Sequence, residues 1–203
     1  MRWQTAAVLE IDESAFSVLL HAYGKATDTP GHLQALLDGD EAARRKALNH
    51  LGYAVLHQGT PWPVTASAAL VIGRILRDAS ITGPETAWLR RALLRWLAEF
   101  GDVAATPYQG DLVADADPPG RDVRSEIARI VADSTDEDGP WDRVVADRQR
   151  ERAMWAQIML DCRRAATHLM DVALAGLTDP DAEVRASAAD AVAMLAQAAE
   201  LAG

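Results

Sequence analysis

An acidic turn followed by an alanine-rich stripe, at residues 177–197, constrains the fold more than any other part of the sequence. The turn reads Asp179-Pro180-Asp181, and Pro180 cannot continue a preceding helix but suits the first turn of a new one. An adjacent Asp can cap that helix, because its carboxylate accepts hydrogen bonds from free backbone N–H groups. Beyond the turn, small apolar residues recur every three or four positions: Val184, Ala188, Ala191, Val192, Leu195 and Ala199. This narrow stripe predicts a helix pressed closely against neighbouring helices.

The same pattern recurs earlier, at residues 36–51. With an offset of 141 residues, Asp38 and Arg44 align with Asp179 and Arg185. In both copies the Arg lies one turn into the second helix, where it can fold back to the turn or reach the Asp of a stacked neighbour. Repeats of about 20–50 residues are typical of solenoids, and the offset would hold three or four helical pairs. We therefore expect these four residues to be structural turn residues.

The pattern Leu-x-Asp-Pro-Asp-x-x-Val-Arg-x-x-Ala-Ala-x-Ala-Val, which begins at Leu177, resembles the turn and second helix of a HEAT repeat. Two further segments, 23–28 (Tyr-Gly-Lys-Ala-Thr-Asp) and 57–60 (His-Gln-Gly-Thr), are similar to the opening of a family of HEAT-repeat domain proteins common in high-GC bacteria. That family is largely uncharacterised. The resemblance implies an all-α fold, a right-handed α-α superhelix of HEAT-like helical pairs, and it implies no catalytic residues.

The helix signals along the chain predict one all-α domain. We expect a single HEAT-like domain over residues 1–203 with about four helical pairs, an acidic loop or insert at about 102–140, and a clear C-terminal repeat at 163–201. From Trp141 to Leu177 the chain has no Pro and only Gly176 as a glycine, which predicts one long helix or two nearly continuous ones. The other expected helices cover 10–22, 28–37, 40–57, 64–78, 85–100 and about 123–131.

The acidic charge of the chain is concentrated in one segment. Of the net charge of −10, residues 111–142 contribute −7, from ten Asp or Glu and three Arg. Two interpretations remain open. Clustered like charge beside Pro118-Pro119-Gly120 is typical of a solvated, partly disordered linker. The same charge would attract a basic partner and speed its association, with Asp136, Glu137 and Asp138 as candidate docking residues.

Motifs for chemistry are missing from the sequence. There is no glycine-rich phosphate loop, nucleophile elbow or His-Glu-x-x-His, so we predict no catalytic residue, no metal site and no cofactor. Cys162, the single cysteine, excludes an intramolecular disulfide, and its apolar helical stripe favours a buried, unreactive thiol. The absence of a long apolar run and of a signal peptide predicts a cytoplasmic protein without membrane association. The acidic charge disfavours nucleic-acid binding, which needs a basic groove.

A polar flank of the helix expected at 40–57 is the candidate binding face. A rotation of about 100° per residue places five polar residues together, away from the apolar stripe around Leu51: Lys46, Asn49, His50, Tyr53 and His57. In helical-pair solenoids the second helix of each pair lines the concave surface, which commonly binds. An ordinary solvated face is the alternative. Trp62, between two prolines, is either an exposed interface anchor or folded over a helix end.

These features favour a non-catalytic protein–protein interaction module that binds another protein, which its acidic charge suggests is basic. A toxin-neutralising immunity protein and a regulatory protein are two concrete versions. An enzyme or a small-molecule binder on the same scaffold stays open as the alternative, with His50, Tyr53 and His57 as its polar groups. A DNA-glycosylase-like activity is disfavoured by the net charge of −10.

Overall fold

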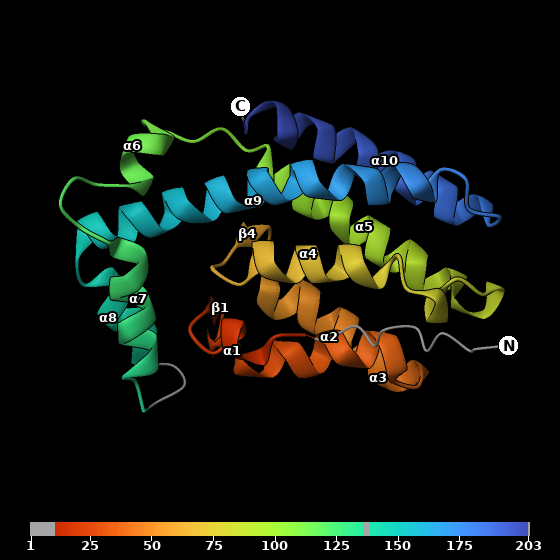
Figure 1. Ribbon diagram of the computed structural model, residues 1–203, viewed down its shortest axis with the longest axis horizontal. Helices are drawn as coiled ribbons and strands as arrows, with labels where there is room; N and C mark the ends of the chain where they lie inside the picture. The colour runs from red at the N-terminus through yellow and green to blue at the C-terminus, as the bar shows by residue number, and fades with distance from the viewer. Residues whose placement is uncertain (1–10, 136–138, 203) are drawn as a thin grey trace, which may run out of the picture.

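A computed structural model describes residues 11–135 and 139–202, which are mostly helical (Figure 1). Six helices form the main stack: α2 (Thr29–Asp38), α3 (Glu41–His50), α4 (Thr65–Ile75), α5 (Ala87–Ala104), α9 (Arg148–Gly176) and α10 (Ala182–Glu200). Along one layer α2 packs on α4 and α4 on α9, while along the other α3 packs on α5 and α5 on α10. The expected all-α class is confirmed. Three helical pairs form this stack, where about four were expected, because the segment between α5 and α9 forms a separate insert.

The alanine-rich stripe of α10 faces the core as predicted. Val184, Ala188, Ala191 and Leu195 are buried, while Val192 is half-buried. Small residues let α10 and α5 approach closely. A Cβ at Gly101 of α5 would meet the backbone carbon of Met194 at 2.7 Å, so only glycine fits there. The predicted burial of Cys162 is also confirmed, and burial raises the pKa of its thiol.

In both aligned turns an Asp caps the following helix and an Arg donates to a backbone carbonyl of the turn. Asp40 caps α3 by accepting from the Ala43 N–H at 2.8 Å, and Asp181 caps α10 by accepting from the Val184 N–H at 3.0 Å. Arg44 donates to the Leu37 carbonyl at 2.7 Å, and Arg185 donates to the Asp179 carbonyl at 2.8 Å.

Both arginines therefore fold back to their own turn, one of the two expected alternatives. The acidic residues at the start of the turns differ. Asp179 pairs with Arg90 of the stacked helix α5, whereas Asp38 only accepts from Gln34 within α2.

The insert contains α6 (Leu112–Ala116), α7 (Val123–Ala132) and α8 (Gly139–Val145), all of which pack on α9. Several of its acidic residues serve as helix caps or ion-pair partners. Asp111 caps α6, Asp122 caps α7, and Arg121 forms ion pairs with Glu126 and Asp147. The described part of this segment therefore forms helices that pack on α9, although acidic side chains such as Asp111 and Asp122 are exposed, as the interpretation as a solvated linker expects. Asp136, Glu137 and Asp138 lie outside the described residues. Of the two forms expected for 141–177, the nearly continuous pair α8 and α9 is the one present.

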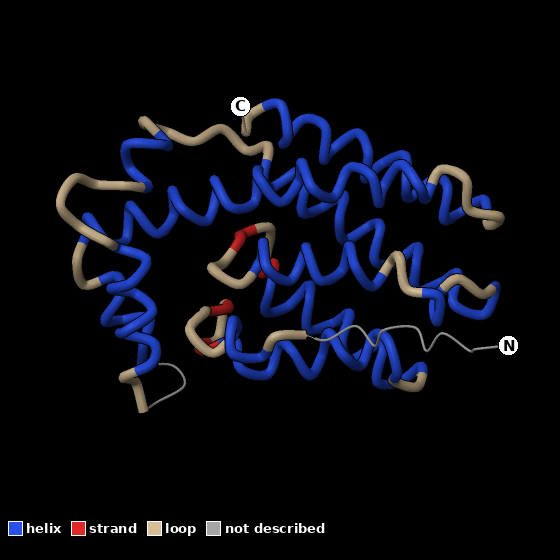
Figure 2. The backbone as a smooth tube through the Cα atoms, viewed as in Figure 1, coloured by secondary structure: helices blue, strands red, loops and turns tan. Residues whose placement is uncertain are grey.

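Two predicted helices are wrong at their C-terminal ends. The first is helical only over α1 (Glu13–Phe16), after which β1 (Leu20–His21) pairs with β2 (Gly24–Lys25). The α-helix predicted to reach residue 57 is α3, and it ends at His50. A π-helical turn, η2 (Leu51–Val55), follows and leads to β3 (Leu56–His57), which pairs with β4 (Thr60–Pro61). The short strands, red in Figure 2, lie at one end of the α2 and α4 layer.

The second hairpin has a clear local cause. Gln58 and Gly59 have φ values of 50° and 72°, the left-handed backbone that a two-residue hairpin turn requires. Short 3₁₀ turns complete the described structure: η1 (Ala26–Asp28), η3 (Ala79–Ile81) and η4 (Pro84–Thr86). In the described ranges, no helix combines the length and apolarity needed to cross a bilayer.

Candidate functional site

The two hairpins meet beside the end of α3. The Ala22 N–H in the loop of the first hairpin donates to the Ala54 carbonyl at 3.0 Å. Val64, just beyond the second hairpin, donates its N–H to the Leu20 carbonyl of β1 at 3.1 Å. The segments 23–28 and 57–60, which carry the resemblance described above, are thereby brought into one place. Four of the five histidines of the chain lie there with two tyrosines.

The outer part of this site is an exposed tyrosine patch, formed by Tyr23, Tyr53 and His57. Tyr23 is 42% exposed and Tyr53 is 62% exposed, and their rings stack with centroids 4.6 Å apart. The His57 Nδ1 lies 2.7 Å from the Tyr53 carbonyl, to which it donates, and 3.4 Å from the Tyr23 hydroxyl. Desolvation and the neighbouring Tyr53 phenol raise the pKa of Tyr23 to about 12. The Tyr23 phenol therefore stays a neutral donor and acceptor at physiological pH.

The inner part is a histidine cluster, formed by His21, Asp28 and His50. Both imidazoles are buried, with 7% and 8% of their side chains exposed, whereas Asp28 is 54% exposed. His21 Nε2 lies 3.1 Å from one Asp28 oxygen, and His50 Nδ1 lies 3.8 Å from the other. The Tyr23 N–H donates to His21 Nδ1 at 3.1 Å, so His21 Nε2 carries the proton and donates to Asp28.

His50 is held on its other side by α2. Its Nε2 lies 3.0 Å from the Thr29 hydroxyl, and the His32 ring stacks on it with centroids 4.1 Å apart. Burial lowers the pKa of His50 to about 4, and burial also lowers the pKa of His32. His50 is therefore a neutral imidazole at pH 7, available as a hydrogen-bond partner or a ligand.

The side chains of Asp28, His50 and Thr29 are arranged in space like an acid–base–nucleophile triad, but this arrangement does not support catalysis. A nucleophile must be reached by its substrate, and the Thr29 side chain is completely buried at the start of α2. Thr29 serves instead to orient the His50 ring. The arrangement with a chemical use is the ligand set, because one nitrogen or oxygen from each of His21, Asp28 and His50 lies within 4.8 Å of the others.

The predicted polar flank is only partly correct. Lys46, Asn49 and Tyr53 are exposed as expected, and His57 is half-buried. His50 was expected on the solvated flank but is buried, because the first hairpin and the start of α2 cover it. Trp62 is half-buried against the rings of Trp141 and Trp155, at 5.0 Å and 5.8 Å, so it is the folded-over alternative.

Sequence reasoning missed His21, Asp28, Thr29 and His32 as site residues. Helical periodicity could not find them, since they come from a short strand, a 3₁₀ turn and the first turns of α2. One signal was present. Segment 23–28 contains Asp28, and segment 57–60 contains His57, so the two segments that carry the resemblance also contribute to the site.

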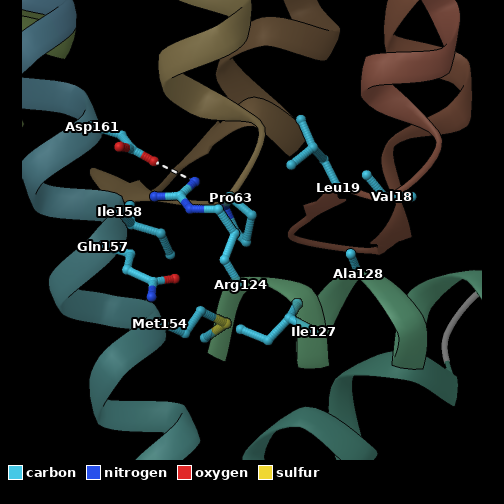
Figure 3. A pocket seen from close by; sticks show the side chains of 10 residues that line it. All are labelled: Val18, Leu19, Pro63, Arg124, Ile127, Ala128, Met154, Gln157, Ile158 and Asp161. Carbon is cyan, nitrogen blue, oxygen red and sulfur yellow. Dashed lines mark hydrogen bonds and ion pairs between the residues drawn. The ribbon is translucent and has the colours of Figure 1, made fainter. Parts of the chain in front are cut away.

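A separate pocket lies between α7 and α9, beside Val18 and Leu19 (Figure 3). Its volume is about 170 Å³, and its lining is mostly apolar. Arg124 of α7 and Asp161 of α9 form an ion pair of 2.9 Å in this lining. The remaining lining residues are Val18, Leu19, Pro63, Ile127, Ala128, Met154, Gln157 and Ile158.

Comparisons with known proteins do not identify a family. No family model, no curated protein and no solved structure matches the chain. Its function is therefore inferred from the tyrosine patch, the histidine cluster and the pocket.

Proposed function

We propose that the chain is a non-catalytic protein-interaction module, built as a HEAT-like right-handed array of helical pairs, and that it docks a partner protein on the tyrosine patch. The layered packing of α2, α4 and α9 on one side and of α3, α5 and α10 on the other supports the array. The turns before α3 and α10, with their capping Asp and folded-back Arg, support a repeated unit.

The observation that carries the docking proposal is the exposed stack of Tyr23 and Tyr53. Two large aromatic rings in contact with each other and with solvent offer apolar area at little entropic cost, since the His57 ring packs edge-on against both and they stack on each other. Tyrosine is enriched at the energetic centres of protein interfaces. The patch therefore has the composition and the rigidity of an interface anchor.

The partner is proposed to be a basic protein. The chain carries a net charge of −10, and the half-exposed Asp28 carboxylate lies beside the patch, bonded to His21 at 3.1 Å. An acidic field steers a basic partner toward the chain and repels nucleic acid. A toxin-neutralising immunity protein and a regulatory protein both fit this description.

The direct test is photo-crosslinking from a defined position. Replacing Tyr53 by the photoreactive amino acid p-benzoylphenylalanine places a crosslinker on the patch, and the same replacement at the exposed Val113 of α6 is the matched control. We expect one protein of the native cell to crosslink from position 53 and not from position 113. A partner that crosslinks equally from both positions contradicts docking on the patch.

The affinity of the crosslinked partner provides the quantitative prediction. Truncation of an aromatic hot spot costs about 2 kcal/mol, so we expect Tyr53→Ala to weaken binding by roughly 30-fold. Val113→Ala should leave the dissociation constant within about twofold of the unmodified chain, because a residue outside the interface contributes little. Calorimetry with the purified partner measures both. An unchanged affinity for Tyr53→Ala would show that the patch is not the anchor.

A small-molecule binder or enzyme on the same scaffold is the second candidate, favoured by the pocket between α7 and α9. Its volume of about 170 Å³ is close to that of a cavity that holds a benzene ring. Native mass spectrometry of the purified chain would detect a retained ligand. Ile158→Trp should fill the pocket and abolish that added mass, whereas Tyr53→Ala should preserve it.

A further inference from the structure

The histidine cluster contains nitrogen and oxygen donors suited to a metal ion, although no metal-binding motif is present in the sequence. We propose that His21, Asp28 and His50 bind one divalent transition-metal ion of the zinc type. Two imidazole nitrogens and one carboxylate oxygen are the ligands that zinc accepts in sites with a fourth, open position. The exposed Asp28 places that open position toward solvent, while both imidazoles approach from the buried side.

The distances between the ligand atoms suit a single ion. Ligands bound tetrahedrally at about 2.0–2.1 Å from zinc lie about 3.3 Å from each other. One Asp28 oxygen lies 3.1 Å from His21 Nε2 and the other lies 3.8 Å from His50 Nδ1, and one ligand atom from each residue lies within 4.8 Å of the others. Small side-chain rotations therefore bring the three atoms to one ion, without movement of the helices.

The surroundings of His50 are those of a metal ligand. When Nδ1 binds the ion, Nε2 keeps its proton and donates to the buried Thr29 hydroxyl, 3.0 Å away. Metal-bound imidazoles typically donate their second N–H to a fixed acceptor, which sets the tautomer and the ring orientation. The His32 ring, stacked on His50 at 4.1 Å, limits its rotation further.

His21 must change its tautomer to bind. Its Nδ1 accepts the Tyr23 N–H at 3.1 Å, so its Nε2 carries a proton that the ion must displace to Nδ1. The Tyr23 N–H then turns away from His21 toward water, which is feasible because Tyr23 lies in the two-residue loop of the hairpin and is itself 42% exposed. Metal binding in the cluster therefore moves the backbone that carries one ring of the tyrosine patch.

The test is a titration of the full chain, stripped of metal by a chelator, with Zn²⁺ followed by calorimetry. We expect one equivalent to bind and Asp28→Asn and His50→Gln each to weaken binding at least about 100-fold, more than the loss of an outer hydrogen bond. Thr29→Val, which removes only the partner of His50, should weaken it about 10–100-fold. His168→Gln, a change of the exposed histidine outside the cluster, should bind like the unmodified chain. Equal binding by Asp28→Asn, His50→Gln and His168→Gln overturns the site, as does the absence of saturable binding.

A second measurement keeps the proposal testable if the variants fail to fold. Nitrogen NMR of the imidazoles in the unmodified chain reports which ring atoms bind Zn²⁺. We expect His21 Nε2, His50 Nδ1 and the Tyr23 amide to shift together, and His168 to stay unchanged. Shifts confined to other residues overturn the proposal. Neither measurement involves a partner protein, so failure of the metal site leaves docking on the tyrosine patch untouched.

Discussion

Arg90 is the residue that ties two neighbouring helical pairs together. Its Nε and Nη2 donate to the two oxygens of Asp179, at 2.7 Å and 3.1 Å, across 89 residues of sequence. Its Nη1 donates to the carbonyls of Ile81 and Gly83, at 2.6 Å and 2.7 Å, in the turn before α5. One buried guanidinium thus joins the turn of its own pair to the turn between α9 and α10.

Removing the carboxylate of Asp179 should therefore destabilise the fold. Breaking one partner of a buried ion pair costs about 3 kcal/mol of unfolding free energy, because the remaining charge stays buried. We expect that loss for Asp179→Asn in urea denaturation at pH 7. The matched control is Asp38→Asn at the aligned position, where the exposed carboxylate accepts a hydrogen bond from Gln34, and it should stay within about 0.5 kcal/mol. Equal losses of unfolding free energy for both substitutions would show that the ion pair of Arg90 with Asp179 does not stabilise the fold.

The same pair predicts a pH dependence. The Arg90 guanidinium holds the pKa of Asp179 below its usual value, so the native carboxylate gives up its proton more readily than the unfolded one. Its stabilisation is present above the unfolded pKa of about 3.9 and is lost as the pH falls through the lower native value. The difference between the unmodified chain and Asp179→Asn should thus shrink when the urea series is repeated near pH 2.5. A difference that persists undiminished there would contradict the ionic origin.

At the scale of single residues, the sequence predicted what is local and missed what is distant. The caps and folded-back arginines of the two turns follow from residues within seven positions of each other. The contact between Arg90 and Asp179, and that between His50 and Thr29, join residues from different elements. Helical periodicity gives no register between elements, so it could not show that His50 is covered.

At the scale of helices, glycine decides how closely α5 and α10 pack. The α10 backbone packs directly against Gly101. A Cβ added to Gly101 would lie 2.7 Å from the Met194 backbone carbon and 2.8 Å from the Leu195 backbone nitrogen. Gly31 in α2 has no atom within 4 Å of an added Cβ. The two glycines therefore offer opposite outcomes for one substitution.

We expect Gly101→Ala to lower the unfolding free energy by about 2 kcal/mol, because the added methyl forces two packed helices apart. Gly31→Ala should raise it by about 0.5–1 kcal/mol, since alanine favours the helix and restricts the unfolded chain. Thermal unfolding of both variants measures the contrast. A stabilised Gly101→Ala variant would mean that α5 and α10 separate without cost.

The helices with a sustained apolar stripe, such as α5 and α10, were predictable because burial on one face imposes a period of about 3.6 residues. The hairpins were not, since each strand has only two residues and shows no alternation. Gln58-Gly59 is a turn signal in the printed sequence, but the helical periodicity before it favoured a helix to residue 57. The site was missed mainly because it is built on these hairpins.

At the scale of the whole molecule, an insert interrupts a stack of helical pairs and covers one end of it. Lys25 of the first hairpin donates to the Ser134 carbonyl at 2.6 Å, next to the acidic residues 136–138. Ser134 therefore lies against the hairpin that carries Tyr23. Since residues 136–138 follow Ser134 closely in the sequence, we predict that their charge contributes to the field that guides a basic partner to the tyrosine patch.

The steering role of residues 136–138 is tested by matched charge changes. Neutralising Asp136, Glu137 and Asp138 to the corresponding amides shifts the net charge from −10 to −7. The control makes the same shift on α9 and α10, by amide substitution of Asp171, Asp190 and Glu200, which are exposed. With the crosslinked partner at low salt, the first variant should associate about tenfold more slowly, because local charge raises encounter rates. The control should change less, and 1 M salt should remove the difference, since the Debye length falls to about 3 Å. Equal slowing by both variants would assign steering to net charge alone, and no slowing by either would remove the acidic segment from the docking mechanism.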